Sequence, residues 1–385
     1  MSIKVLLIGS SVDRNFIRLV NNLVKNNFSD DLTIDIFHTN PPLHNKLSGR
    51  LTELTPRIRK FISISNTNIN NRFLARIVFL LKFICQVIRI KNNEYDLVNI
   101  HYMSGNFFFV MDILKKKTKK ILITPWGSDV YKVKGINFLL IKLAYKKANY
   151  ISFGSFKFKK DISKIFKVPE NKFIELCFGS EIIDLINNHS EITKECSKKL
   201  LGISGLVIVC GYNASPNQQH IEIINAFNKI KHKLPPNSLL VFPMTYAKNV
   251  KYTNYIKDKL KETNLNYKIY EDFLTDIELT YLRKCADIFI HVQKTDAFSA
   301  TVQEYLLSDT TVINGSWLEY SDLEKWGIPY IKVNNFDELS IILEKIINNE
   351  CRIKIKDELK KDILSRGYAN QATKWIDCYQ FISEN

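Results

Sequence analysis

The sequence predicts an α/β protein with two parallel β-sheets, each covered by helices on both faces. The chain has 385 residues, more than one ordinary hydrophobic core encloses, so two domains are expected. Short apolar runs typical of buried strands alternate with segments whose apolar residues have helical spacing. Glycine-rich or polar loops follow most of the strand-like runs, and open parallel sheets bind ligands at these positions.

The first half is expected to contain six strands and two clear helices. The predicted strands are residues 4–8, 32–37, 97–100, 120–124, 150–153 and 173–177. One helix is predicted over residues 15–26, and a second runs from Phe73 to Ile90. Between the second strand and the second helix, a Pro-Pro turn opens a segment without a clear pattern that extends to about residue 71.

The second half repeats the alternation and ends in a separate helix. Its predicted strands are residues 205–210, 238–242, 267–270, 287–290 and 310–313, and its predicted helices are 221–232, 252–262, 276–285, 300–307 and 371–382. A charged stretch over 187–199 marks the boundary between the halves. The predicted organisation is a first domain over 1–180, a linker over 181–204, a second domain over 205–366 and a final segment over 367–385.

The charge balance favours an anionic partner. The chain has 55 lysines and arginines against 39 aspartates and glutamates, a net charge of +16, which attracts nucleic acid, anionic lipid or phosphorylated substrates. No basic motif with interleaved aromatic residues is present, so nucleic acid is ranked last and no nucleic-acid partner is expected.

The cysteines and the amino terminus indicate a cytoplasmic protein. Seven cysteines at irregular spacing, without a C-x-x-C pair, predict reduced, buried thiols rather than disulfides or a zinc site. His220 and His291 have no partner at metal-ligand spacing, so no metal is expected. The apolar run over residues 3–9 is too short for a signal peptide and indicates a buried strand.

The helix predicted from Phe73 to Ile90 has two interpretations. It is about as long as a transmembrane helix but is interrupted by Arg76, Lys82 and Arg89. Much apolar surface with only cationic charges suits a helix in the plane of an anionic membrane. The alternative is a core helix whose few cations point to water, and the sequence leaves both open.

The stretch over residues 291–314 is the main candidate site. A strand-like run ends near His291, a loop of small and polar residues follows, and a helix begins at Ala300. Backbone N–H groups at such a helix start bind anions. Two acids, Asp296 and Glu304, stand eight positions apart around this point. The functional interpretation is a site for the diphosphate and ribose of a nucleotide-sugar, and the alternative is an ordinary turn with a capping Asp.

Polar residues at other strand ends are candidates with structural alternatives. His101 would contact a sugar hydroxyl or bond to a backbone carbonyl. Asp129 would bind a hydroxyl or cap the following helix. In the loop over 211–220, N–H groups and amides could meet phosphate or base, although no cation is present, and a plain turn is the alternative. Tyr246 could stack or hydrogen-bond, and Lys248 could reach a diphosphate.

These segments together resemble a GT-B glycosyltransferase of family 4. Asp296-x7-Glu304 resembles the family's E-x7-E element. The resemblance implies that Glu304 holds the donor ribose and that the backbone of Ser299, Ala300 and Thr301 binds the diphosphate. The first acid is Asp rather than Glu. The fold implied is two Rossmann-like domains facing each other across a cleft, with the last helix crossing back to the first domain.

Three further segments carry the resemblance. Residues 96–102 resemble the D-x-x-H-x-H segment and place His101 on the histidine of the catalytic side. Residues 126–129 resemble the H-G-S-D loop, with Trp126 replacing His, and residues 178–181 resemble the interdomain N-G-x-D segment, with Glu181 replacing Asp.

The family's Arg and Lys after the first strand of the second domain are missing. Residues 211–215 and 243–246 instead resemble the family 56 fucosamine transferases, which use a dTDP-sugar and a lipid-linked acceptor. Family 4 retains the anomeric configuration and family 56 inverts it.

The resemblance implies a hexosyltransferase that moves a sugar from a nucleotide-sugar to a polyprenyl-linked glycan, in O-antigen (lipopolysaccharide) or other bacterial surface polysaccharide biosynthesis. We expect retention of configuration, no metal or cofactor, and a peripheral location on the inner face of the cell membrane. The alternatives are an inverting dTDP-sugar transferase, an epimerase, a phosphorylase, or a non-catalytic scaffold of the same fold.

The expected site residues form three groups. The expected catalytic residues are His101, Asp129 and Asp296. The expected donor-binding residues are Gly9, Ser10, Gly211, Tyr212, Asn213, Thr245, Tyr246, Lys248, Ser299, Ala300, Thr301 and Glu304. The expected membrane contacts are Arg72, Arg76, Lys82, Arg89 and the helix from Phe73 to Ile90.

Overall fold

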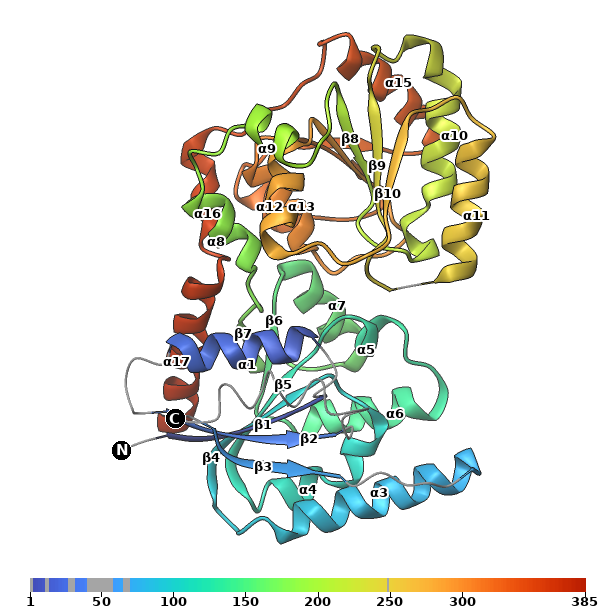
Figure 1. Cartoon of the computed structure of the whole chain (residues 1–385). Coiled ribbons are helices and arrows are strands. Elements are labelled where there is room, and N and C mark those ends of the chain that lie inside the picture. The colour runs from blue at the N-terminus through green and yellow to red at the C-terminus, as the bar shows by residue number, and fades with distance from the viewer. Residues whose placement is uncertain (1–2, 11–13, 27–31, 40–57, 65–69, 248) are drawn as a thin grey trace. The chain divides into compact units, whose positions relative to one another are not determined.

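The computed structural model describes residues 3–10, 14–26, 32–39, 58–64, 70–247 and 249–385. These residues form two compact units, of which unit 1 is Met1–Gly179 with Tyr368–Asn385 and unit 2 is Ser180–Gly367. Each unit is built around one parallel sheet, so the predicted α/β fold with two parallel sheets is confirmed (Figure 1).

Unit 1 contains a seven-stranded parallel sheet in the order β3-β2-β1-β4-β5-β6-β7. Its strands are β1 (Ile3–Gly9), β2 (Leu32–His38), β3 (Ile58–Ser63), β4 (Tyr95–His101), β5 (Thr118–Thr124), β6 (Tyr150–Phe153) and β7 (Phe173–Glu175). Its helices are α1 (Arg14–Asn26), α3 (Arg72–Arg89), η2 (Gly105–Phe109), α4 (Met111–Leu114), α5 (Ser128–Tyr131), α6 (Gly135–Lys147), α7 (Phe156–Phe166), η3 (Glu170–Lys172) and α17 (Tyr368–Glu384).

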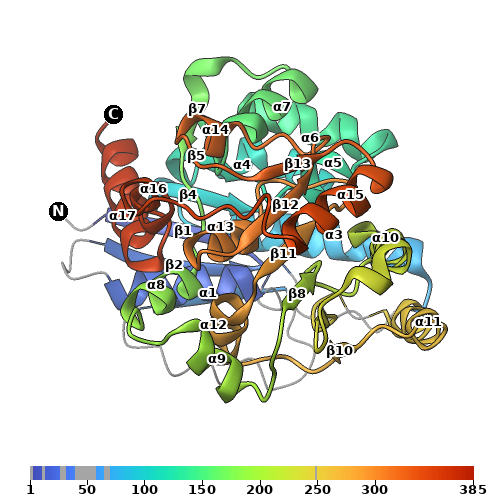
Figure 2. The same ribbon diagram turned by 90° about the horizontal axis from the view of Figure 1, so that it is seen from above.

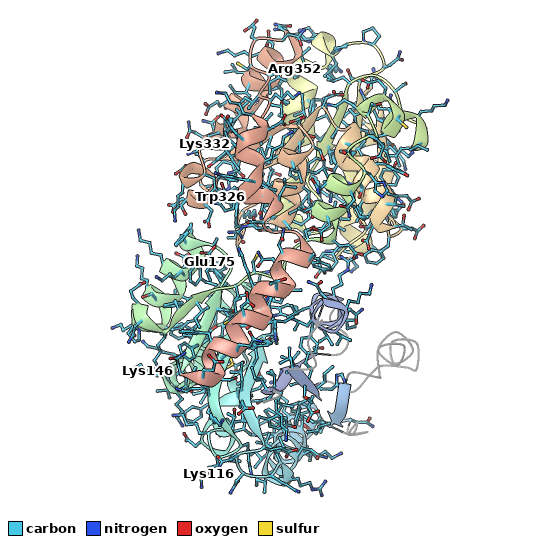
Figure 3. The ribbon with its side chains drawn as sticks, turned by 90° about the vertical axis from the view of Figure 1, so that its left-hand side faces the viewer. Lys116, Lys146, Glu175, Trp326, Lys332 and Arg352 are labelled. Atoms are coloured by element: carbon cyan, nitrogen blue, oxygen red, sulfur yellow. The ribbon has the colours of Figure 1, made fainter. Side chains whose placement is uncertain are left out.

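The faces of this sheet follow from the alternation of side chains along each strand. Val5 and Leu7 of β1 pack into one cluster with α1 and with Trp375 and Tyr379 of α17. Figure 1 shows α1 and α17 on this face and α3 and α4 on the opposite face. Figure 3 shows α17 along unit 1, with Lys116, which shortly precedes β5, near one end of that unit. The last helix is therefore part of unit 1.

Unit 2 contains a six-stranded parallel sheet in the order β10-β9-β8-β11-β12-β13. Its strands are β8 (Val207–Cys210), β9 (Leu239–Pro243), β10 (Tyr267–Tyr270), β11 (Ile288–His291), β12 (Thr311–Gly315) and β13 (Ile331–Val333). Its helices are α8 (Glu181–Asn188), α9 (Lys194–Leu200), η4 (Pro216–Gln218), α10 (His220–Ile230), η5 (Lys231–Lys233), α11 (Val250–Lys261), α12 (Asp276–Cys285), α13 (Ala300–Leu307), α14 (Ser321–Lys325), α15 (Phe336–Ile347), η6 (Asp357–Leu359) and α16 (Lys360–Leu364).

Two apolar clusters lie on the two faces of this sheet. One joins the sheet to α8, α12, α13 and α16, and the other joins it to α10, α11 and α15 (Figure 2). Helix α12 begins with a capping box, in which Thr275 and Glu278 satisfy each other's backbone N–H groups. This cap fixes the start of the helix that carries Arg283, a residue of the site described below.

Several predicted elements need correction. Residues 181–204, expected to be a linker, contain α8 and α9 and belong to unit 2. The segment expected to lack a pattern contains edge strand β3, while residues 40–57 and 65–69 lie outside the described residues. The seven cysteines are free, as predicted, but Cys85 and Cys196 are exposed rather than buried.

Helix α3 fits neither of its two interpretations, a membrane-surface helix or a core helix, completely. Its Phe83 and Val87 are buried, whereas five large apolar side chains are exposed: Phe73, Leu74, Ile77, Leu81 and Ile88. The helix is therefore neither wholly core nor wholly solvated. None of the helices in the described part of the chain is long and apolar enough to cross a membrane.

Candidate functional site

The carboxyl-terminal edge of the unit 2 sheet brings three loops together. These loops follow β8, β11 and β12, which are neighbours in the sheet. Asn217 Nδ2 donates to Thr295 O at 3.1 Å, and Trp317 Nε1 donates to Gln293 O at 2.7 Å. These hydrogen bonds hold the loops as one surface, at the edge where parallel sheets bind ligands.

A buried polar network underlies this surface. His291 Nδ1 lies 2.8 Å from Asn314 Oδ1, and Gln293 Nε2 lies 3.1 Å from His291 Nε2. Gln218 Nε2 donates to Gln293 Oε1 at 2.7 Å. Burial lowers the pKa of His291, and the neighbouring Asp296 opposes this shift only in part, so the imidazole is neutral at pH 7. The network links the loops after β8, β11 and β12 through neutral groups.

Asp296 holds the loop that leads into α13. Its Oδ2 accepts from the backbone N of Ser299 at 2.7 Å and from the hydroxyl of Tyr320. The loop contains Phe298 at φ 72°, an uncommon conformation for a residue with a side chain. The observed role of Asp296 is thus to fix the approach to the helix, and its predicted catalytic role remains a prediction.

Helix α13 begins at this edge. Ser299 is its N-cap, and the Ser299 hydroxyl accepts from the backbone N of Thr301 at 3.2 Å. Ala300 and Thr301 are half-buried. The first N–H groups of a helix lack partners within the helix, and its dipole favours negative charge there. Ser299, Ala300 and Thr301 therefore stand where an anion would be bound.

Glu304 lies one turn further along α13 and is 5% exposed. Its Oε2 accepts from Arg283 Nε at 3.0 Å, and its Oε1 accepts from the Ser180 hydroxyl at 2.7 Å. Arg283 also donates to the hydroxyl of Tyr305 at 2.9 Å. The carboxylate predicted to hold a ribose is thus already held by two side chains of unit 2.

The loop after β8 is shaped by Gly211. Its φ is 66°, and a Cβ there would lie 2.7 Å from Gln218 Oε1, so the loop requires glycine. The Tyr212 ring stacks on His291 with centroids 6.0 Å apart. Asn213 Oδ1 accepts from the backbone N of Ser215 at 2.9 Å. Gly211, Tyr212 and Asn213 therefore lie at the same edge as Ser299.

The loop after β9 joins the same edge. The backbone N of Ala214 donates to Tyr246 O at 2.8 Å, Thr245 is buried, and the Tyr246 side chain is half exposed. Lys248, which was expected to reach the diphosphate, lies outside the described residues.

His101 belongs to unit 1 and is enclosed by aromatic rings. The rings are those of Phe16, Trp126, Phe178 and Trp375, with centroids 5.2, 6.4, 6.1 and 6.0 Å from that of the imidazole. The residue is 2% exposed, and neither ring nitrogen has a hydrogen-bond partner among the described residues. Burial lowers the pKa of His101 to about 3, so the side chain is neutral at pH 7 and closed to solvent.

Asp129 connects two strand-end loops of unit 1. Its carboxylate accepts from the backbone N of Trp126 at 2.8 Å and of Met103 at 2.9 Å. Burial raises the pKa of Asp129 to about 6, although the backbone N–H groups oppose the shift. The two bonds join the loops after β4 and β5 rather than cap the next helix. The expected contact of Asp129 with a hydroxyl stays a prediction.

Gly9 and Ser10, predicted to bind the donor, also belong to unit 1. Gly9 ends β1, and a Cβ there would lie 2.5 Å from the Phe16 ring, so this glycine permits close packing of α1. The predicted site residues are therefore divided between two units. His101 and Asp129 belong to unit 1 with Gly9 and Ser10, and the other predicted site residues that the structure describes belong to unit 2.

Several residues of the unit 2 site were missed at the sequence level. His291 and Gln293 alternate at the end of β11, a spacing that places both side chains on one face and that could have been noticed. Arg283 and Ser180 gave no comparable signal, because they lie 21 and 124 positions from Glu304. Among the described residues, no group of three or more His, Cys, Asp or Glu side chains is placed to hold a metal ion.

Comparison with known structures identifies the fold. A glycosyltransferase from Rickettsia africae superposes with a TM-score of 0.74 at 18% identity, covering 100% of this chain and 99% of that one. HepE of Anabaena, solved with UDP and glucose, superposes at 0.69 with 14% identity over 98% and 99% of the two chains. The chain has the GT-B fold. A third GT-B match is sucrose-phosphate synthase of Thermosynechococcus elongatus, with a TM-score of 0.71, 14% identity and complete coverage of both chains.

A sequence family supports this assignment for the first unit. Residues 12–155 match the family model described as "Glycosyl transferase 4-like". These residues include His101 and Asp129 but not the α13 segment. No curated protein sequence matches the chain. The resemblance to family 4 is thus supported, and the resemblance to family 56 remains a prediction.

Proposed function

We propose that this GT-B protein is a hexosyltransferase that binds a nucleotide-sugar at the carboxyl-terminal edge of the unit 2 sheet. The observation that carries the proposal is the match of residues 12–155 to a glycosyltransferase family model, within a chain that has the GT-B fold throughout. Two features of this sheet edge also support the proposal. The N-terminus of α13 is suited to bind an anion, and a buried hydrogen-bond network holds the surrounding loops.

In the proposed reaction, the bond between the sugar C1 and the donor phosphate breaks, and a bond from C1 to an acceptor hydroxyl oxygen forms. Negative charge develops on the departing diphosphate. The backbone N–H group of Ala300 would stabilise this charge. The N–H groups of Ser299 and Thr301 would contribute once they exchange their bonds to Asp296 and to the Ser299 hydroxyl for bonds to phosphate. The donor and acceptor would react mainly because they are held in position, with no metal or other cofactor required.

Glu304 is proposed to accept a hydrogen bond from a ribose hydroxyl. A carboxylate oxygen has two lone pairs, and Oε1 accepts only the Ser180 hydroxyl among its described bonds. Oε1 can therefore accept a second hydrogen bond, from the ribose hydroxyl, while Oε2 keeps its pair with Arg283. Asp296 is proposed to act nearby, through the loop that it holds.

On the acceptor side, we propose that His101 and Asp129 contact a sugar hydroxyl. Both are buried in unit 1, so contact with a sugar hydroxyl requires the aromatic cluster around His101 to open when substrate binds. Once it opens, neutral His101 can accept a proton from the attacking hydroxyl.

The acceptor is proposed to be a polyprenyl-linked glycan at the inner face of the cell membrane, in O-antigen or other surface polysaccharide synthesis. The exposed apolar stripe of α3, with exposed Arg76 and Arg89, suits the plane of an anionic membrane. Lys82 lies on the same helix, and the side chain of Arg72 lies outside the described residues.

Retention of configuration is proposed, which requires the acceptor hydroxyl to approach C1 from the face that the phosphate leaves. An inverting dTDP-sugar transferase, in which the hydroxyl attacks from the opposite face, is the second candidate. One observation favours the second candidate: the loop over residues 211–220 lacks lysine and arginine. NMR of the first-formed product would decide, because the coupling constant of the transferred sugar reports its anomeric configuration.

The function is tested with the full chain and a thermal-shift panel of UDP-, GDP- and dTDP-sugars. A donor that binds only the folded state should raise stability by ~2.7 kcal/mol at a hundred times its dissociation constant. Any donor that binds is then tested for hydrolysis and transfer, with and without EDTA. If no sugar nucleotide raises the thermal stability and none is turned over, the proposed enzyme activity is wrong and a non-catalytic scaffold is favoured. Turnover that EDTA abolishes would refute the metal-independent reaction.

A further inference from the structure

The proposed donor site has few cations, although the chain carries a large positive charge. The three loops at the edge, residues 211–220, 292–299 and 314–320, contain no arginine, and Lys294 is their single lysine. The Lys294 side chain is exposed, and Arg283 is paired with Glu304. Apart from Lys294, the hydrogen-bond donors that these loops offer a bound phosphate are neutral.

Two backbone carbonyls fix the orientation of Asn314 at one end of the buried network. Asn314 Nδ2 donates to the carbonyls of Gly315 and Leu318, both at 3.0 Å, so Asn314 Oδ1 faces His291 Nδ1. His291 Nδ1 must then carry the proton. Because burial lowers the pKa of His291 and the ring is neutral, Nε2 carries no proton and acts as an acceptor.

The other end of the network is fixed at Gln218. Its Oε1 accepts from the backbone N of Tyr212 at 3.2 Å, so its Nε2 faces and donates to Gln293 Oε1 at 2.7 Å. Gln293 Nε2 is left to donate its two hydrogens, one to His291 Nε2 at 3.1 Å and one to the Tyr212 hydroxyl oxygen at 3.3 Å. Backbone groups at both ends therefore determine the orientation of Gln293.

This arrangement sets the Tyr212 hydroxyl as a donor. Its oxygen accepts from Gln293, so its own proton is directed to an acceptor other than Gln293. The hydroxyl also forms hydrogen bonds with the side chains of Gln218 and of Ser299, the N-cap of α13, so a phosphate oxygen there would take the place of the Ser299 contact. Burial and the charge of Asp296 raise the pKa of the phenol, so it keeps its proton at neutral pH.

We propose that Tyr212 is a diphosphate-binding residue whose hydroxyl donates a hydrogen bond to a phosphate oxygen of the nucleotide-sugar beside the N-terminus of α13. The neutral hydroxyl would stabilise the phosphate by a hydrogen bond, where a lysine or arginine would stabilise it by its charge. Gln293 is the positioning residue that keeps the phenolic proton directed away from the network. The inference rests on the proposed function, because it presumes that a nucleotide diphosphate binds at this edge.

The test measures calorimetric affinities of the full chain for UDP, GDP and dTDP, each compared with its own nucleoside. Tyr212→Phe keeps the ring on His291 and removes only the hydroxyl. It should weaken binding of the diphosphate by about tenfold or more and leave nucleoside affinity within about twofold. Tyr252→Phe is the matched control. Its hydroxyl contacts His220, 3.2 Å from Nδ1, and its loss should leave both affinities unchanged.

Two results would overturn the assignment, and they are distinct. If no diphosphate binds the wild-type chain, the proposed function fails and Tyr212 loses its role with it. If a diphosphate binds wild type and Tyr212→Phe equally, the function stands and the role of Tyr212 is wrong. Thermal unfolding of each variant separates loss of contact from loss of fold.

The positioning role of Gln293 has its own measurement, a double-mutant cycle. Gln293→Met cannot donate to Tyr212, so it should weaken diphosphate binding in the wild-type background. In the Tyr212→Phe background the same substitution should have little further effect. Equal, additive losses in the two backgrounds would contradict action through Tyr212.

Discussion

Arg283 and Glu304 form an ion pair in unit 2 in which the side chains are only 5% and 6% exposed, with Arg283 Nε 3.0 Å from Glu304 Oε2. The guanidinium also lies over the Tyr305 ring, 4.5 Å from its centroid. Helix α12 is thereby fastened to α13, the helix whose N-terminus faces the proposed diphosphate. The residue with the clearest functional expectation is therefore also a structural one.

Replacing Glu304 should destabilise unit 2. Glu304→Ala leaves the buried Arg283 charge without its carboxylate and with only the Tyr305 contacts, a change that typically costs about 3–5 kcal/mol. Glu304→Gln keeps an acceptor for Arg283 and should cost less. Urea unfolding of both variants measures this. If Glu304→Ala is as stable as wild type, the pair is not needed for the fold, and any activity loss would then report on the donor alone.

Replacing His101 should separate stability from function. Neither imidazole nitrogen has a described hydrogen-bond partner, and an unsatisfied buried polar group costs about 1–3 kcal/mol. His101→Leu should therefore unfold at equal or higher urea concentration than wild type. If His101 takes the acceptor proton, the same variant should lose about a hundredfold or more in turnover.

The combination of the two readouts for His101→Leu is decisive. A stable variant with full turnover would assign His101 to packing alone. A variant that loses stability would show that the imidazole has a structural partner, such as a buried water. Trp375→Phe serves as the control for disturbance of the aromatic cluster, because it shrinks a neighbouring buried ring and removes the bond from Trp375 Nε1 to Cys177 O but keeps His101.

The strands could be predicted from sequence because parallel strands buried on both faces read as continuous apolar runs. Val5, Leu6, Leu7 and Ile8 are all fully buried. Strand β3 escaped notice because it is an edge strand with Arg59 and Lys60 in its centre, as edge strands often have. Helix α15 is not among the predicted helices, although the sequence contains signals for it. Its N-cap Asn335 and the spacing of Leu339 and Leu343 are typical of a helix.

The site was predictable in position but not in the direction of its side chains. Loops after strands of a parallel sheet share an edge, so Gly211, Asp296 and Ser299 could be placed together. Whether Glu304 faces ligand or Arg283 depends on how α12 packs on α13, which no local pattern encodes. In the same way, the charges of α9 suggested a linker, yet Lys194 and Lys198 pair with Asp287, about 90 positions away.

The exposed apolar side chains of α3 predict membrane binding that one substitution, at Leu81, should weaken. Leu81→Asp should lower partitioning onto vesicles of phosphatidylglycerol and phosphatidylethanolamine by about tenfold or more, because an apolar contact is lost and a negative charge is added. Ile341→Asp on α15 is the control, because Leu81 and Ile341 are each 56% exposed. Equal sedimentation of both variants with vesicles would refute docking through α3.

The buried carboxylate of Asp129 predicts a pH dependence of stability with a definite sign. Burial raises its pKa to about 6 from a model-compound value of 3.8, so the folded state holds the proton more tightly than the unfolded chain. Its contribution is complete below pH 3.8 and is lost as pH rises through 6, a change of about 3 kcal/mol. Asp129→Asn cannot titrate and lacks this component. Urea unfolding from pH 4 to 7 should therefore show the stability of wild type, relative to the variant, falling across that window, and a constant difference would show that Asp129 stays ionised throughout.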